Sequence, residues 1–252
     1  MEELKGRAEL AVVLGSGLGA FERLVQIDRE VPYRVFDGLS DPTVEGHKGL
    51  VILGRSEECP LILFSGRLHC YEGLSIEEAG SPARIASELG CKRLLLTQAA
   101  GSLRRDLAVG SWMLPKDIVS LPLRPIANRP GEGVGRALIS ETFRLEIIDA
   151  ARRRGAQLRE GILFWATGPC YETPAESLAA VELGASAASM SGLPELAVAR
   201  AVGLEAAVLS LITNHAPSVS GGGAEHGSVI RTGEKGVPAL GDIVAGLLSG
   251  GG

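Results

Sequence analysis

The sequence predicts an α/β fold in which helices cover both faces of a central β-sheet. Short apolar segments alternate with helical stretches along the chain, and several of these segments are apolar on both faces, as strands of a covered sheet are. No internal repeat or linker divides the 252 residues, so we expect a single domain, residues 1–252. Because 45% of the residues are hydrophobic but only 4% are aromatic, Leu, Val, Ile and Ala must fill the core.

The order of strand, loop and helix along the chain supports this class. The expected strands are Leu10–Leu14, Leu50–Leu53, Leu61–Phe64, Arg93–Thr97, Ile118–Leu121, Gly161–Trp165 and Ala207–Thr213. The expected helices are Ile76–Leu89, Ile139–Arg154, Pro174–Leu183, Leu196–Val202 and Ile243–Leu248. Residues 249–252, a serine followed by three glycines, are expected to be disordered.

Charge and composition narrow the class of protein. The formal net charge of −5 argues against a nucleic-acid partner, which usually requires a basic face. The four cysteines fit no zinc spacing and no secreted disulfide pattern. The first residues do not resemble a signal peptide, and no apolar run reaches membrane-spanning length. We therefore expect a cytoplasmic protein that binds neither membrane nor nucleic acid.

The stretch Thr167–Glu176 carries the most informative motif. Thr173 can cap a helix that starts one residue later, and Glu176 can complete a capping box, so the residues just before it stand at a rigid strand-to-helix junction. There Tyr171 offers a ring on which a flat heterocycle can stack, and Glu172 offers a carboxylate to hydrogen-bond it. A capped helix start with a solvated acid is the alternative interpretation.

Two further stretches contain groups suited to an anion. In Gly15–Gly19, glycines and Ser16 bring backbone amides and a hydroxyl to the end of the first strand. Farther along, an extended backbone would place Arg67, His69 and Tyr71 on one side, where an arginine and a histidine can share a phosphate. An ordinary tight turn and a solvated arginine are the alternatives.

Other strand ends offer groups for a sugar and a base. Thr97–Ser102 leaves backbone amides open at the carboxyl edge of the sheet. Met190 offers a soft apolar surface, and Ser191 offers a hydroxyl near a helix start. Asn214 can both donate and accept, which suits a purine edge with a carbonyl and a ring nitrogen. A routine turn, a core methionine and a turn asparagine are the alternatives.

Two histidines lie in loops. His47 precedes a strand, and His226 follows the glycine-rich stretch Ser218–Ala224, which has the composition of a mobile flap. Alone, each is more often an incidental loop histidine than a catalytic one. A metal site built from His47, His69 and Cys70 lacks a third ligand at a recognised spacing, so we expect no metal.

In chain order, these motifs resemble those of the trimeric purine nucleoside phosphorylases, from about Val12 to the last helix. The matching motifs are Gly15–Gly19, Gly46-His47, Gly66–Gly73, Thr97–Gly101, Gly168–Thr173, Met190-Ser191 and Thr213-Asn214. The resemblance implies a mixed, partly barrel-like sheet flanked by helices, assembled as a homotrimer. It also implies phosphorolysis of purine nucleosides to the free base and ribose 1-phosphate, with inorganic phosphate as co-substrate and no cofactor.

The resemblance implies a role for individual residues. The expected phosphate ligands are Ser16, Arg67, His69, the backbone amide of Ala99 and Ser191, with His47 beside them. Tyr71, Met190 and His226 are expected to line the ribose, and Tyr171, Glu172 and Asn214 to bind the base. The expected catalytic residues are His69, Glu172 and Asn214. A phosphate dianion would stabilise the positive charge that develops on the sugar as the purine leaves.

The residues at the base predict a preference for inosine, guanosine and their deoxy forms. Asn214 can donate to a 6-oxygen and Glu172 accepts from a protonated N1, whereas adenosine presents an amino group and an unprotonated N1. Methylthioadenosine phosphorylases differ at these two positions, where they carry aspartate and serine. Such a phosphorylase, or a non-catalytic purine- or phosphate-binding protein, is the alternative.

The chain departs from the family pattern at a few places. Gln98 stands where asparagine is usual, Ser189 where glycine is usual, and Gly192 where threonine is usual. These changes affect the base pocket or loop packing and spare the main polar contacts. Residues 122–139 are shorter than the family's loop, and residues 123–136 lack the aromatic that covers a neighbouring subunit's ribose. This departure bears on two expectations: that a neighbouring subunit completes the wall of the ribose site, and that the trimer has the family's geometry.

Overall fold

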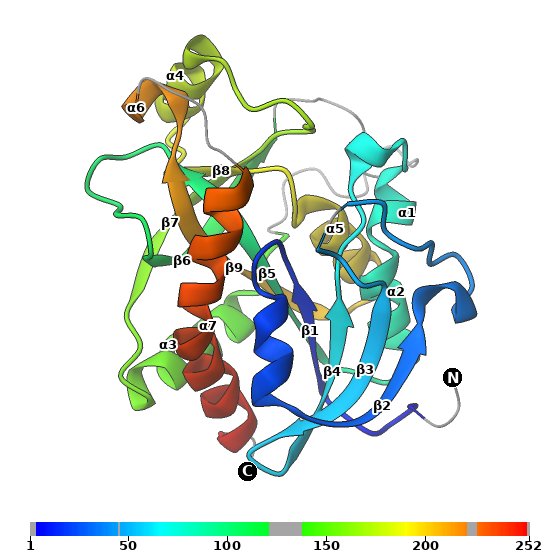
Figure 1. Cartoon of the computed structure of the whole chain (residues 1–252). Coiled ribbons are helices and arrows are strands. Elements are labelled where there is room, and N and C mark those ends of the chain that lie inside the picture. The colour runs from blue at the N-terminus through cyan, green and yellow to red at the C-terminus, as the bar shows by residue number, and fades with distance from the viewer. Residues whose placement is uncertain (1–3, 45, 121–137, 221–225, 251–252) are drawn as a thin grey trace.

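A mixed β-sheet forms the centre of the fold (Figure 1). The computed structural model describes residues 4–44, 46–120, 138–220 and 226–250, and within these ranges the sheet has nine strands in the order β2-β3-β4-β1-β5-β8-β7-β6-β9. The strands are β1 (Leu10–Leu14), β2 (Gln26–Pro32), β3 (Leu50–Ser56), β4 (Cys59–Ser65), β5 (Arg93–Ser102), β6 (Trp112–Ser120), β7 (Leu158–Trp165), β8 (Ala187–Ser189) and β9 (Glu205–His215).

The sheet closes partly on itself, which confirms the expected mixed and partly barrel-like arrangement. β4, β1, β5 and β9 run parallel to one another. β8 is antiparallel to β5 and β6 is antiparallel to β9, so β5, β8, β7, β6 and β9 form a closed ring of strands. Because parallel strands end at the same edge of a sheet, the segments that follow β1, β4 and β5 gather on one side of the molecule.

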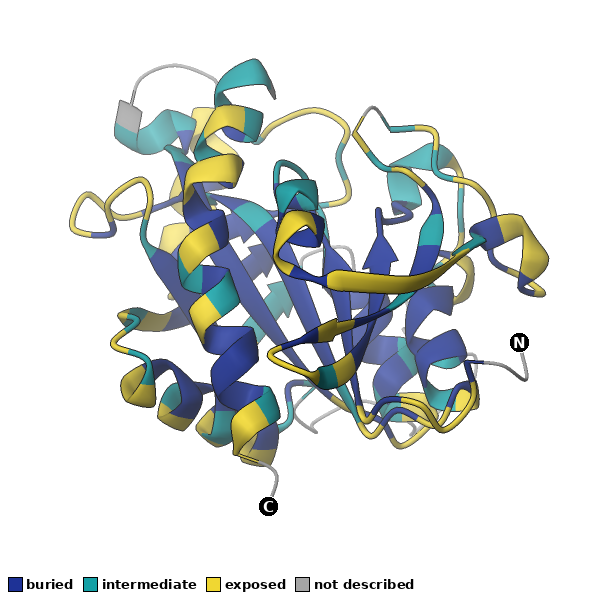
Figure 2. Ribbon diagram, turned by 60° about the horizontal axis from the view of Figure 1, so that its bottom comes forward, coloured by how far each residue is buried: buried dark blue, intermediate teal, exposed yellow. Residues whose placement is uncertain are grey.

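Helices cover both sides of the sheet. They are α1 (Ile76–Ala79), α2 (Ser81–Glu88), α3 (Glu141–Arg153), α4 (Pro174–Glu182), α5 (Leu193–Ala201), α6 (Pro217–Ser220) and α7 (His226–Ser249), with short 3-10 helices at Gly19–Leu24, Tyr33–Val35 and Cys70–Glu72. α3 packs against α7, whereas α1 and α2 pack against α5, and Figure 1 shows the two groups on different sides of the strands. Exposed residues lie on the outer faces of the helices (Figure 2).

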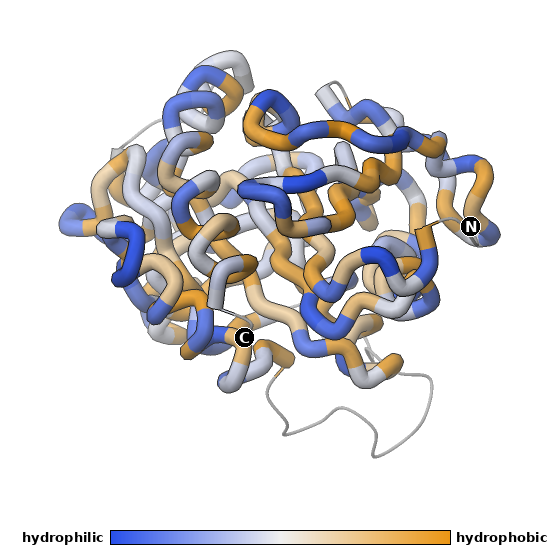
Figure 3. The backbone as a smooth tube through the Cα atoms, turned by 90° about the horizontal axis from the view of Figure 1, so that it is seen from below, coloured by the Kyte–Doolittle hydropathy of each residue, from blue (hydrophilic) through white to orange (hydrophobic). Residues whose placement is uncertain are grey.

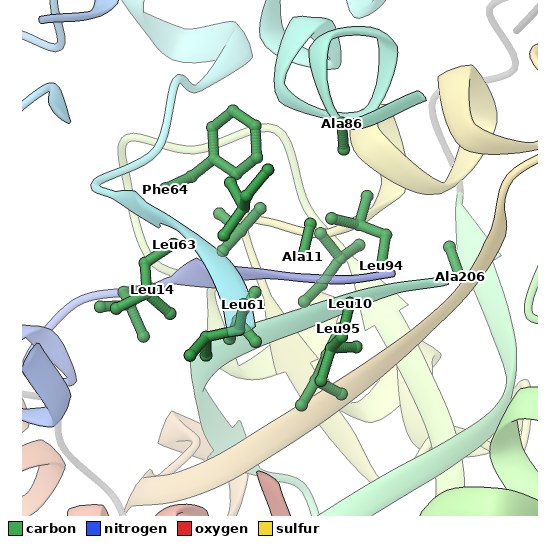
Figure 4. Close-up of a cluster of buried hydrophobic side chains, with 14 of the residues drawn as sticks. Leu10, Ala11, Leu14, Leu61, Leu63, Phe64, Ala86, Leu94, Leu95 and Ala206 are labelled. Atoms are coloured by element: carbon green, nitrogen blue, oxygen red, sulfur yellow. The ribbon is translucent and has the colours of Figure 1, made fainter. Parts of the chain in front are cut away.

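The middle of the sheet is apolar on both faces. All five residues of β1 are buried, as are five of the seven residues of β4. Figure 4 shows a cluster of buried hydrophobic side chains from β1, β4 and neighbouring elements, whose labelled members are Leu10, Ala11, Leu14, Leu61, Leu63, Phe64, Ala86, Leu94, Leu95 and Ala206. Seen from below, hydrophobic segments run through the interior and hydrophilic ones along the outer bends (Figure 3). The aliphatic core that the composition predicts is therefore present.

Two predicted helices differ from the structure. The expected helix Ile76–Leu89 is divided at Gly80, where a Cβ atom would lie 2.4 Å from Val198 Cγ2 and 2.5 Å from the Pro194 carbonyl oxygen. The last helix begins at His226 rather than near residue 243. Its glycines and Pro238 disfavour a helix in isolation, but tertiary contacts override this preference. Gly233, for example, packs so tightly on Gly17 that a Cβ would lie 2.6 Å from its Cα.

The strand predictions miss two elements and several boundaries. β2 has an exposed, charged sequence and lies at the edge of the sheet, so it lacks the apolar pattern that marks a strand. β8 has only three residues. Ser249 belongs to α7, which corrects the expected disorder at 249, while 251–252 lie outside the described residues. The loop at 122–136 and part of the glycine-rich stretch, 221–224, also lie outside them, and residues 218–220 of that stretch belong to α6.

None of the described helices combines the length and apolar character that crossing a bilayer requires.

We predict that Gly80→Ala destabilises the protein, because its methyl group would collide with the backbone of Pro194 where α5 crosses α1 and α2. The expected loss in the free energy of unfolding is about 2 kcal/mol, measured by urea denaturation. Gly19→Ala is the matched control, since no atom lies within 4 Å of a Cβ at that position. An equal loss in the free energy of unfolding in both variants would contradict the tight contact between Gly80 and Pro194.

Candidate active site

A cavity of about 380 Å³ lies at the carboxyl edge of the sheet, where segments from distant parts of the sequence converge. It is lined by residues that follow β1, β4, β7 and β8 and by the last residues of β5 and β9. Ten of the twelve predicted site residues line it: Ser16, Arg67, His69, Tyr71, Ala99, Tyr171, Glu172, Met190, Ser191 and Asn214. The loop that carries Arg67 and the loop that carries Glu172 therefore line one cavity, as the sequence predicts.

The other two predicted residues are histidines. His47 does not line the cavity but contacts two residues that do, Ser16 and Arg67. His226 is the first residue of α7, and its side chain lies outside the described part of the structure. Val229, three residues later, lines the cavity, so the start of α7 does lie at this site.

Arg67 is buried at one end of the cavity, with only 1% of its surface exposed. Its Nε donates to Glu195 Oε1 at 2.5 Å, and its Nη1 donates to the Thr97 carbonyl oxygen at 2.8 Å. Glu195 is itself fully buried at the start of α5. Among the described residues, Nη2 of Arg67 has no hydrogen-bond partner. A buried cationic donor is thus held by two neighbours while one of its nitrogens is left for a ligand.

The backbone around Arg67 fixes the protonation pattern of His47. The backbone N–H of Arg67 donates to His47 Nδ1 at 3.1 Å, so Nδ1 carries no proton and the neutral ring must carry it on Nε2. That Nε2 faces Ser16 Oγ at 3.5 Å. Gly66 permits this approach, since it has a φ of 117° and a Cβ there would lie 2.8 Å from His47 Cβ. His47 therefore supports the loop that carries Ser16.

His69 is oriented by an acidic residue three positions later. Glu72 Oε1 accepts from the His69 backbone N–H at 2.8 Å and lies 3.0 Å from Nδ1, while its Oε2 accepts from the hydroxyl of Thr43 at 2.6 Å. Burial, with the nearby positive charge of Arg67, lowers the pKa of His69. The imidazole is therefore held with Nδ1 toward Glu72, which leaves Nε2 for other partners.

Tyr71 stacks on His69, with ring centroids 4.6 Å apart and planes inclined by 16°. The predicted extended backbone at 67–71 is wrong, because Cys70–Glu72 forms a 3-10 turn. Arg67, His69 and Tyr71 nevertheless all line the cavity. Burial raises the pKa of the Tyr71 hydroxyl to about 12, so it stays a neutral donor at physiological pH.

At the other end of the cavity, Glu172 precedes α4 on a rigid junction. Thr173 caps this helix through the Glu176 backbone N–H, and Glu176 Oε2 accepts in return from the Thr173 backbone N–H, which is the capping box that the sequence predicts. Burial raises the pKa of the Glu172 carboxyl, and the negative charge of Glu176 adds to that effect. Tyr171 beside it is 44% exposed, so one part of its ring lines the cavity while another faces solvent.

Asn214 lies near the end of β9 and faces the same cavity. Its Oδ1 accepts from Thr213 Oγ1 at 2.9 Å, and its Nδ2 donates to the His215 carbonyl oxygen at 3.2 Å. A Cβ at Gly101 would lie 3.0 Å from Nδ2, so the neighbouring strand must approach closely. The amide is thus oriented by its surroundings before any ligand binds.

Met190 and Tyr71 lie between the two ends of the cavity. Gly168 packs against both: a Cβ there would lie 2.6 Å from Met190 Sδ and 2.7 Å from Tyr71 Cδ1. Gly168 also has a φ of 75°, which side chains rarely adopt. The loop before Glu172 is therefore packed against the apolar middle of the site.

Sequence reasoning missed Glu195 and Glu72, which hold two of the predicted residues. Glu195 lies 128 residues from Arg67, and the expected helix began only at Leu196, so the sequence did not place Glu195 in a helix. Glu72 is part of the motif around His69, and its spacing of three residues from His69 could have indicated their pairing. No group of metal-ligating side chains large enough to hold an ion occurs in the described ranges.

Comparisons with known proteins agree with the fold. Residues 9–249 match the model of the Phosphorylase superfamily. Purine nucleoside phosphorylase 1 of Geobacillus stearothermophilus is 34% identical over 93% of this chain and 88% of its own, and purine nucleoside phosphorylase of Mycobacterium tuberculosis is 34% identical over 97% and 90%. The crystal structure of Schistosoma mansoni purine nucleoside phosphorylase with adenosine superposes with a TM-score of 0.84 at 28% identity, covering 98% of this chain and 92% of that one. A schistosoma structure with hypoxanthine gives a TM-score of 0.82.

We predict that Glu195→Gln destabilises the protein strongly, because it leaves the buried charge of Arg67 without its counter-ion. The expected loss in the free energy of unfolding is about 3 kcal/mol or more, measured by chemical denaturation. Glu88→Gln, which breaks the exposed pair with Arg84, should cost less than about 1 kcal/mol. If both variants lost the same free energy of unfolding, the buried pair of Arg67 and Glu195 would contribute no more to stability than the exposed pair.

Proposed function

The chain belongs to the Phosphorylase superfamily, among the purine nucleoside phosphorylases, and we propose that it catalyses the reversible phosphorolysis of purine nucleosides. The observation that carries the proposal is that one cavity is lined by a buried arginine, a carboxylate and an amide, together with apolar side chains. The arginine suits an oxyanion, the carboxylate and the amide suit a purine, and the apolar side chains suit a sugar. Related structures with adenosine and hypoxanthine support a purine ligand.

Phosphate binds at the end that contains Arg67. Its free Nη2 supplies a charge-assisted hydrogen bond, and Ser16, Ser191, His69 and the backbone amide of Ala99 complete the set. His47 acts through Ser16 rather than by lining the cavity. This arrangement is supported by the lining residues and by the contacts that hold Arg67 in place.

The ribose lies between phosphate and base, against Tyr71 and Met190, with His226 at its 5′-hydroxyl. Phosphate attacks the anomeric carbon as its bond to the purine nitrogen breaks, and the sugar passes through a state with oxocarbenium character. The phosphate dianion stabilises this positive charge electrostatically, and the enclosed site holds the reactants in line. The products are the free base and ribose 1-phosphate, with no covalent enzyme intermediate.

The base stacks on Tyr171 and is read by Glu172 and Asn214. Nδ2 of Asn214 donates to the 6-oxygen, and the Glu172 carboxylate accepts from N1–H. Negative charge develops on the purine, including its 6-oxygen, as the bond to the sugar breaks, so the Asn214 amide stabilises the departing base. We therefore assign 6-oxopurine nucleosides, inosine and guanosine and their deoxy forms, as substrates.

The proposal needs no cofactor, because phosphate is the attacking group. We further propose that the enzyme is cytoplasmic and assembles as a homotrimer, in line with the sequence resemblance. A mass in solution that differs from the mass of three chains would contradict the homotrimer but not the proposed phosphorolysis.

We predict that inosine releases hypoxanthine only when phosphate is present, and that inosine is consumed faster than adenosine. Chromatography of the products checks both points. Release without phosphate would identify a hydrolase, and binding of inosine without turnover would identify a non-catalytic purine-binding protein. Turnover of adenosine or methylthioadenosine equal to that of inosine would overturn the 6-oxopurine assignment.

We predict that Asn214→Asp shifts the preference toward 6-amino purines, because a carboxylate accepts from an amino group and repels a carbonyl oxygen. The ratio of kcat/KM for adenosine to that for inosine should rise about tenfold or more, the value of one lost or gained hydrogen bond to a charged group. Ser210→Ala, a change at a buried serine outside the cavity lining, is the matched control. An unchanged ratio in Asn214→Asp would show that this residue does not read position 6.

We predict that the same ratio rises as the pH falls. Burial raises the pKa of Glu172, so its carboxyl gains a proton at a higher pH than an exposed glutamate does. A protonated carboxyl can donate to the unprotonated N1 of adenosine, and it accepts more weakly than a carboxylate from N1–H of inosine. The ratio, measured between about pH 8 and pH 5, should therefore increase toward acid. In Glu172→Gln, which cannot titrate, it should stay flat; a parallel rise would assign the effect to another group.

A further inference from the structure

Gln98 is a buried polar residue of the cavity that the roles above do not use. Its side chain exposes 1% of its surface, yet it belongs to the cavity lining. Nε2 donates to the hydroxyl of Ser210 on the neighbouring strand at 3.1 Å. Within the described ranges, Oε1 has no hydrogen-bond partner. A buried acceptor without a donor is unfavourable, so the side chain is suited to a ligand that brings one.

The free oxygen of Gln98 lies beside Gly192, the residue that follows Ser191. A Cβ at Gly192 would lie 2.7 Å from Gln98 Oε1. The residue before Gln98 is Thr97, whose carbonyl oxygen accepts from Arg67 Nη1. Gln98 is therefore adjacent in the chain to a residue that binds Arg67, and its free oxygen rests beside the residue that follows Ser191.

Gln98 and Gly192 fit one another. The structure gives a physical reason why these two residues occur together. Any side chain at 192 would collide with the glutamine oxygen, and the φ of 91° at Gly192 is also one that side chains rarely adopt. The longer glutamine thus occupies space that only a glycine leaves free, and its oxygen is directed there.

We propose that Gln98 Oε1 accepts a hydrogen bond from a protonated oxygen of the bound tetrahedral oxyanion, and so selects hydrogen phosphate over sulfate. This inference rests on the proposed phosphorolysis. At neutral pH inorganic phosphate and arsenate each carry an O–H group, whereas sulfate carries none. Phosphate satisfies both the free donor of Arg67 and the free acceptor of Gln98.

Sulfate would meet the same donors but would also face the lone pairs of Gln98 with its own oxygens. In a buried site this contact is repulsive, and the acceptor stays unsatisfied. A water molecule at Oε1 would serve either anion equally and would produce no selectivity. The acceptor at Gln98 Oε1 therefore predicts that the site binds hydrogen phosphate more tightly than sulfate, although the two anions have the same shape and formal charge.

The test compares the wild-type enzyme with Gln98→Met, which keeps the length of the side chain but removes the acceptor. The KM for phosphate and the inhibition constant of sulfate are measured in inosine phosphorolysis, and the binding of both anions is measured by calorimetry in the absence of nucleoside. The ratio of the sulfate constant to the phosphate constant should fall about tenfold or more in the variant. Because a ratio is compared, a general loss of folding or affinity cancels.

Arsenate is the control, and Ser210→Ala is a second test. Arsenate carries an O–H group and should follow phosphate in both proteins. Ser210→Ala removes the acceptor that orients the Gln98 amide, so it should also lower the selectivity. An unchanged ratio in Gln98→Met, or arsenate that behaves like sulfate, would overturn this inference while phosphorolysis continues. Absence of phosphorolysis in the wild-type enzyme, with selective anion binding retained, would instead overturn the proposed function.

Discussion

The burial of the Arg67 guanidinium group determines the geometry of the carboxyl edge of the sheet, where the cavity lies. Removing a charge from water is costly unless an opposite charge and well-placed acceptors replace the solvent. For Arg67 these come from Glu195 on α5 and from the Thr97 carbonyl of β5. Gly15 is constrained by the same group, since a Cβ there would lie 2.5 Å from the Thr97 oxygen and 3.2 Å from Arg67 Nη1. The ion pair thus fixes α5 and the first glycine loop relative to the sheet.

The second end of the cavity is fixed relative to the first by direct packing. Tyr71 stacks on His69 on one side and contacts Gly168 on the other, so it joins the loop that carries Arg67 to the loop that carries Glu172. The capping box of α4 then holds Glu172 against the protein rather than on a free loop. Two polar ends at a constant separation, with an apolar middle, are what a nucleoside and its attacking anion require.

The sequence allowed most of this site to be predicted because its groups follow apolar strands, and strand ends meet at one edge of an α/β sheet. Ser16, Arg67 and Asn214 were recognisable for that reason. Glu195 was not, because pairing across 128 residues depends on how α5 crosses the sheet. The length of α7 was also missed, since its stability comes from contacts such as Gly233 on Gly17 rather than from helix propensity.

Unsatisfied polar atoms are informative about ligands only where a cavity reaches them. Ser177 Oγ is buried and unpaired among the described residues, but it does not line the cavity described above. Arg67 Nη2 and Gln98 Oε1 are unpaired as well, and their residues line the same cavity. One is a donor and the other an acceptor, so a ligand that satisfies both must itself carry an acceptor and a donor. A fully deprotonated oxyanion carries only acceptors, whereas a singly protonated one carries both, which makes the protonation state of the anion part of what this site recognises.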